Sequence, residues 1–66
     1  MLVVMKQSAT AADIDRVCNW IKEKGYTAQP MPGAQRTAIG LVGNDGRVDG
    51  SPLEDLPGVA EVIYVS

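Results

Sequence analysis

The segment AQRTAIGLVGND, residues 34 to 45, is rich in glycine and invites interpretation as a phosphate-binding loop. Its glycines and the next two along the chain are Gly40, Gly43, Gly46 and Gly50. Their spacing matches neither G-x-G-x-x-G nor the pattern that ends in Gly-Lys-Ser/Thr. No long helix is expected after them to direct its N-terminal amides at an anion. The spacing therefore favours a strand and a turn over a phosphate site.

The other residues that could do chemistry are oxygen ligands and one thiol. The candidate oxygen ligands match no calcium-loop spacing, and turn or capping roles explain them; they are Asn44, Asp45, Asp49, Glu54 and Asp55. Cys18 has no second cysteine and no histidine to form a disulfide or metal site, so it is interpreted as a small core residue in a reducing, cytoplasmic compartment. With no nucleophile beside a base, no catalytic site and no cofactor are predicted for this chain.

Length and composition predict one small domain spanning residues 1–66. A chain of 66 residues has a thin core, which a partner surface could complete. Its net charge of −2, with scattered basic residues, disfavours nucleic-acid binding. The apolar run at residues 2–5 is too short for a signal peptide or a membrane span. The abrupt end after VIYVS suggests a domain cut from a longer protein, with a small free-standing protein as the alternative.

The first half of the chain predicts a strand, a helix and an edge strand. Residues 2–5 read as a buried strand. The spacing of Thr10 and Asp13 matches a capping box, and Gly25 suits a helix C-terminus, so a helix is expected over 11–24. Trp20 is expected at the margin of its apolar face or exposed. Residues 26–31 can form a strand, and Pro30 places it at a sheet edge.

The second half predicts a strand, a short helix and a last strand. Residues 36–42 form the strand, closed by a turn at 44–46. Ser51 is expected to cap the helix, with Pro52 at its first position and Glu54 completing a capping box. Pro57 and Gly58 end it, and residues 59–65 form the last strand.

The order β-α-β-β-α-β predicts an α+β, ferredoxin-like sandwich, with a four-stranded antiparallel sheet and two helices on one face. Ile39 and Leu41 are assigned to the helix-covered core. The uncovered face is also apolar, so it is expected to pack on another domain or another copy; scattered surface aliphatics are the alternative. The residues assigned to that interface are Val3, Met5, Ala38, Gly40 and Val42.

Three segments resemble one known family. They are LVVMKQSATAADIDRV at the start, GAQRTAIGLVGND in the centre and LEDLPGVAEVIYVS at the end. Together they resemble the N-terminal ferredoxin-like regulatory domain of 3-deoxy-7-phosphoheptulonate (DAHP) synthase. The run Arg36-Thr37-x-Ile39-Gly40-x-x-Gly43 is the most specific part.

This resemblance implies a regulatory domain attached to a (β/α)₈ barrel, which lies outside this chain and carries a divalent metal. The barrel condenses phosphoenolpyruvate with erythrose 4-phosphate in aromatic amino-acid synthesis. In feedback-inhibited members, extensions from different subunits pair and bind tyrosine or phenylalanine between them. The matching effector positions are Gln29 and Met31, with Arg36 and Thr37 of the specific run beside them. Tyrosine-sensing members have histidine and serine at the first two, so phenylalanine, another ligand or no ligand stay open.

Two other classes of protein are considered. One is a free-standing interaction module that docks by its uncovered sheet face or by Trp20 and binds no ligand. The other is a small enzyme of acylphosphatase type, for which Lys6-Gln7-Ser8-Ala9 lacks the arginine and glycines of an anion-binding loop.

Overall fold

The computed structural model describes residues 1–43 and 48–64. Its elements follow the predicted order: β1 (Leu2–Met5), α1 (Ala11–Glu23), β2 (Thr27–Pro32), β3 (Thr37–Val42), α2 (Ser51–Glu54) and β4 (Val59–Ile63). Their boundaries lie within two residues of the predicted ones. The turn predicted at 44–46 and the strand end predicted at Val65 fall outside the described residues.

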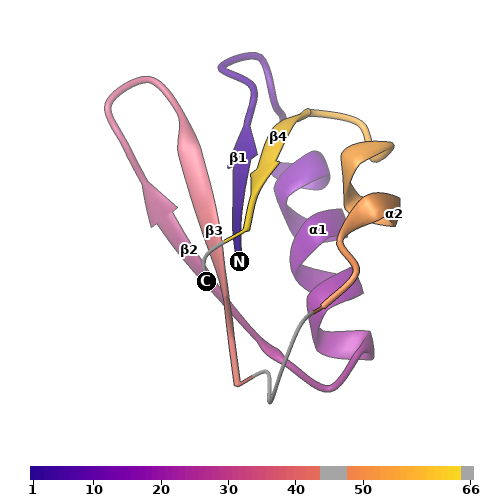
Figure 1. The fold of residues 1–66 in the computed structure, drawn as a ribbon. Helices are drawn as coiled ribbons and strands as arrows, with labels where there is room; N and C mark the ends of the chain where they lie inside the picture. Colours follow the sequence, from indigo (N-terminus) through magenta and orange to yellow (C-terminus); the bar gives the residue numbers. More distant parts are fainter. Residues whose placement is uncertain (44–47, 65–66) are drawn as a thin grey trace.

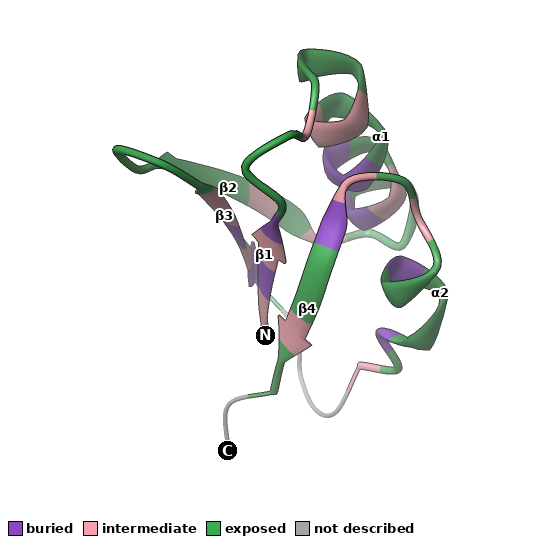
Figure 2. Cartoon of the chain, turned by 90° about the horizontal axis from the view of Figure 1, so that it is seen from above, coloured by how far each residue is buried: buried purple, intermediate pink, exposed green. Residues whose placement is uncertain are grey.

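The strands form one antiparallel sheet in the order β2-β3-β1-β4 (Figure 1). The first and third strands lie in the middle, and the second lies at an edge, as Pro30 predicted. Both helices lie on the same side of the sheet, which leaves its other side uncovered (Figure 2). None of the described helices is long and apolar enough to cross a membrane.

The helix α1 begins at the predicted capping box. The Asp13 N–H donates to Thr10 Oγ1 at 3.1 Å, and the Thr10 N–H donates to Asp13 Oδ2 at 3.0 Å. These bonds satisfy two backbone donors that a helix N-terminus leaves unpaired. At the other end Gly25 has a φ of 88°, and Trp20 is half-buried with the Lys24 ammonium 5.4 Å from its ring.

The helix α2 is capped differently from the prediction. Gly50 is its N-cap, Ser51 is its first residue, and the expected Ser51–Glu54 capping box does not form. Asp49 Oδ1 instead accepts from the Ser51 N–H at 3.0 Å and from the Ser51 hydroxyl at 2.7 Å. An aspartate that bonds to the backbone two residues later closes a turn of its own, so the Ser51 hydroxyl is drawn back to Asp49 and not forward into the helix.

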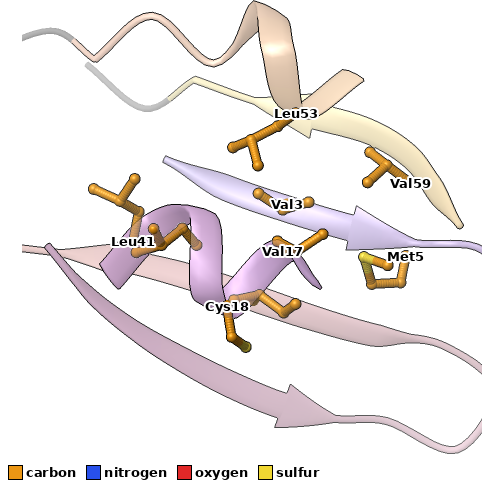
Figure 3. Packing of buried hydrophobic residues seen from close by; sticks show 9 residues of the cluster. Val3, Met5, Val17, Cys18, Leu41, Leu53 and Val59 are labelled. Carbon is orange, nitrogen blue, oxygen red and sulfur yellow. The ribbon is translucent and has the colours of Figure 1, made fainter. Parts of the chain in front are cut away.

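The core lies between the sheet and the helices and is entirely apolar (Figure 3). Val17, Cys18 and Ile21 supply the buried face of α1, and Leu53 supplies that of α2. No polar side chain is buried in the part of the chain that the structure describes. The sheet contributes the remaining members, which are Val3, Met5, Ile39, Leu41 and Val59.

Two glycines with positive φ provide a matched test of the contact between the α2–β4 turn and α1. A Cβ on Gly58 would lie 2.8 Å from Asp13 Oδ2, whereas one on Gly25 would have no atom within 4 Å. We expect Gly25→Ala to cost about 1–2 kcal/mol, because only backbone strain is added. Gly58→Ala should cost more, because it also displaces the Asp13 carboxylate from Thr10. Urea unfolding measures both, and equal losses would contradict the proposed contact.

The capping box also predicts a dependence of stability on acid pH. The hydrogen bond from the Thr10 N–H lowers the pKa of the Asp13 carboxyl, and Arg16, whose Nη1 lies 3.1 Å from Asp13 Oδ1, lowers it further. Because the folded pKa is below the unfolded one, this contribution is complete above the ordinary Asp pKa of about 3.9 and is lost as pH falls through the folded value. In urea unfolding across that range, Asp13→Asn should flatten the pH dependence. Asp15→Asn, which removes the same charge from an exposed position of α1 and leaves the capping box intact, is the control.

Candidate docking surface on the uncovered side of the sheet

The register of the strands decides which residues face away from the helices. Val3 pairs with Ile39, and both are fully buried beneath the helices. Because side chains alternate along a strand, their sequence neighbours point to the other side. We call that side the open face. Its described residues are Leu2, Val4, Thr27, Gln29, Met31, Ala38, Gly40, Val42, Glu61 and Ile63.

The prediction that Val3 and Met5 belong to this surface is wrong. Both side chains have 0% exposure and pack in the core. The cause is the unbroken apolar run of β1, in which alternation of polarity cannot indicate which residues point inward. Leu2 and Val4, which are half-buried, are the residues that β1 contributes to the open face.

The remaining predicted interface residues lie where they were placed. Ala38 and Gly40 are half-buried and Val42 is 47% exposed, all on the open face. Ile39 and Leu41 point into the core, as predicted. Their role in an interface stays a prediction.

Most of the described residues of the open face are apolar. Met31 and Ile63 are 45% and 41% exposed, and both lie on this face with Val42. Glu61 is the one charged residue in the described set. Large exposed apolar side chains gathered on one side of a small domain are typical of a surface that packs on a partner.

Gly40 has no evident purpose within the domain itself. Its φ is not positive, and an added Cβ would meet Met31 Cε at 3.6 Å and the Gln29 carbonyl oxygen at 3.8 Å, which are ordinary contacts. Alanine would therefore fit and would lose less backbone entropy on folding. Because Gly40 has no side chain of its own, the Met31 methyl group and Gln29 of the neighbouring strand lie against its backbone.

The four predicted effector residues are only partly brought together. Gln29 and Met31 face outward from β2, opposite Gly40 and Ala38. Arg36 lies in the β2–β3 hairpin, where its carbonyl accepts from the Gly33 N–H at 2.9 Å, and its side chain is exposed. Thr37 lies two residues before Ile39 in β3, so its side chain points to the same side of the sheet, toward the helices.

A polar hollow of about 480 Å³ lies beside α2, and the sequence analysis did not predict it. Val48, Asp49, Ser51, Glu54 and Tyr64 line it. The Gly50 N–H donates to the Tyr64 phenol oxygen at 3.2 Å, which joins the start of α2 to the chain just after β4. Its polar contacts hold the start of the helix, and no imidazole is available to activate the Ser51 hydroxyl.

No other described group forms a reactive centre. Burial raises the pKa of the Cys18 thiol, so this side chain stays neutral within the core. Among residues 1–43 and 48–64, no three His, Cys, Asp or Glu side chains are close enough to hold a metal. The distinctive surface of the described chain is therefore the open face.

A βαββαβ chain whose helices cover one side of a β2-β3-β1-β4 sheet is a ferredoxin-like domain, and this one presents an apolar surface on its other side. The family model described as the DAHP synthase ferredoxin-like domain matches residues 1–66. The chain belongs to that family.

A solved structure gives the same result. The chain is similar to the crystal structure of phospho-2-dehydro-3-deoxyheptonate aldolase (DAHP synthase) from Thermotoga maritima, with a TM-score of 0.88 and 31% sequence identity. The similarity covers 98% of this chain and 19% of that one, so this chain spans about a fifth of that synthase. A comparison with curated proteins found no match.

The geometry at Gly40 predicts that this glycine lowers the stability of the isolated domain. Gly40→Ala should raise the free energy of unfolding by about 0.5–1 kcal/mol, because the added methyl group fits and the unfolded chain loses freedom. Gly33→Ala serves as the control, since its Cβ would lie 2.6 Å from the Arg36 carbonyl oxygen and should destabilise. Urea unfolding checks both, and a loss of stability in Gly40→Ala would mean that the glycine is needed by the fold.

Proposed function

We propose that this chain is the regulatory and assembly domain of a DAHP synthase. It pairs with another copy through the open face and mediates feedback inhibition by an aromatic amino acid. The catalytic condensation of phosphoenolpyruvate with erythrose 4-phosphate belongs to a barrel outside this chain. Membership of the family supports the link to the synthase. The observation that carries the regulatory part is the apolar open face, in which Gly40 has no side chain and lies against Gln29 and Met31.

Pairing through the open face has a physical basis. The exposed side chains of Met31, Val42 and Ile63 would be removed from water by a second copy, and burial of apolar area contributes about 25 cal/mol per Å². A small domain with a thin core gains from such a partner. At Gly40 a partner side chain or a ligand that displaces the flexible Met31 side chain would approach the sheet backbone closely, because the glycine has no side chain of its own.

The residues around Gly40 suit an aromatic ligand. Met31 offers a polarizable thioether to the ring, and the Gln29 amide can bond to a carboxylate or a phenol. Neither side chain supplies a charge, so a ligand would depend on ring contacts and on hydrogen bonds to the uncharged Gln29 amide. This favours phenylalanine and tyrosine about equally.

Inhibition would follow from linkage between ligand binding and pairing. A ligand that contacts both copies binds the paired state better than the separate one, so it shifts the population by its difference in affinity. Paired domains would then restrict access to the attached barrels. If no ligand binds, the domain keeps an assembly role alone.

Pairing can be tested by adding one negative charge to either side of the domain. Val42→Glu should shift the chain toward monomer by about tenfold or more in dissociation constant, because a carboxylate would be buried against an apolar surface. Ala12→Glu adds the same charge at an exposed position near the N-terminus of α1, where it is tolerated. Sedimentation equilibrium at micromolar concentrations measures both. A strictly monomeric parent chain would contradict the pairing.

Ligand binding can be tested by adding phenylalanine or tyrosine at millimolar concentration under conditions where the chain is paired. We expect chemical-shift changes in the amides of Gln29, Met31 and Gly40, and their reduction in Gln29→Ala. Gln7→Ala, at an exposed position outside the sheet, is the control. If the chain pairs but neither amino acid changes these chemical shifts, the domain has an assembly role only, and feedback inhibition by these ligands is excluded.

A further inference from the structure

The two edges of the sheet differ in the backbone groups that they present to solvent. At the β2 edge, the Gly33 N–H donates to the Arg36 carbonyl, so these two residues form a hydrogen-bonded pair. Antiparallel pairs alternate between hydrogen-bonded and non-hydrogen-bonded ones. With the observed register, Gln29 and Met31 therefore bond to β3. The residues of β2 whose backbone nitrogen points outward are Ala28, Pro30 and Pro32.

Two of these three outward positions are prolines, which have no N–H to donate. A strand added beside β2 would find the Ala28 amide as its single donor within the strand. Natural sheets close exposed edges in this way. The β2 edge is therefore closed to pairing.

The β4 edge has the opposite character. The Leu41 N–H donates to the Met1 carbonyl at 3.0 Å, so Met1 bonds to β3, while Leu2 and Val4 bond to β4 on the other side. Their partners Ile63 and Glu61 consequently bond inward. Val62, between them, directs its N–H and carbonyl outward.

The outward side of β4 is available for a partner. β4 is the outermost strand of the sheet, and residues 59–64 contain no proline. Ile63 and Tyr64, next to the outward Val62 amide, are 41% and 44% exposed. An uncapped apolar edge of this kind is a template for strand addition.

We infer that β4 pairs antiparallel with β4 of a second copy, about a two-fold axis at Val62, and so joins two sheets edge to edge. A two-fold relation between identical edge strands makes them antiparallel and brings the same residues together from both copies. The pairing at Val62 places Glu61 opposite Ile63 and Ala60 opposite Tyr64. The smallest side chain of this segment then lies beside the largest.

Electrostatic repulsion disfavours the register whose two-fold axis lies one residue earlier, at Glu61. Moving the axis to Glu61 would set the two Glu61 carboxylates directly opposite each other, which is destabilising. At Val62 each Glu61 faces an aliphatic side chain. The resulting sheet continues both open faces in one surface. The edge contact is made by the backbone of β4 and the face contact by side chains of the open face, so the two can form independently, although Ile63 takes part in both.

Amide hydrogen exchange tests the inference within one native chain. When the protein concentration is raised until copies associate, the Val62 amide should exchange about tenfold slower or more, because it enters an intermolecular ladder. The Ala28 amide, which also points outward but at the closed edge, should be unchanged. Protection of Ala28 alone, or of neither amide while the chain associates, would overturn the inference.

Two proline variants complete the test. Val62→Pro removes the central outward donor without removing a bond to β1, so association through the edge should weaken at least tenfold in sedimentation equilibrium. Ala28→Pro removes the matched donor of β2 and should associate as the parent chain does.

In Val42→Glu, which disrupts the open face, the Val62 amide should still become protected as concentration rises. Loss of that protection would mean that the edge does not pair independently. Retained folding is checked by the dispersion of amide resonances, and if Val62→Pro does not fold, the exchange comparison in the parent chain decides.

Discussion

The pairing of Val3 with Ile39 at the centre of the sheet is the constraint on which the remaining structure depends. Both side chains are fully buried beneath the helices. Because a strand has a period of two residues, burying this pair sets the direction of every other side chain in the two central strands. A shift of one residue would exchange the core with the exterior. The composition of the open face is therefore a consequence of how the core is packed.

Most of the fold could be predicted because local signals agree with one another. The capping box at Thr10 and Asp13, the glycine at 25 and the proline at 30 each mark a boundary or an edge that the structure contains. The direction of the β1 side chains could not be predicted, because an unbroken apolar run does not indicate which residues face the helices. Only the pairing with β3 determines this. The N-cap of α2, Gly50, was missed because Ser51 has an oxygen that can cap, but its hydroxyl donates back to Asp49 Oδ1 and forms no cap.

The candidate site was harder to predict than the fold. Val42, Ala38 and Gly40 could be assigned to one surface since they alternate with clearly buried neighbours. Thr37 was grouped with Gln29 and Met31 by their shared family pattern, although it points to the opposite side of the sheet. Proximity in a motif does not indicate which side of a sheet a residue occupies. Gly40 illustrates the reverse case, because a residue that we expect to weaken the isolated strand lies on the open face.

The prolines of β2 have a consequence for the size of any assembly. A sheet with two receptive edges can add copies without limit, as fibrils do. A sheet with one receptive edge stops growing when that edge is filled. The free edge of each added copy is then its β2 strand, which contains Pro30 and Pro32. Edge contacts between copies of this chain can therefore make a closed pair but cannot make a filament. Two prolines, each of which removes a hydrogen-bond donor from β2, therefore limit to two the number of copies that can join through the sheet edges.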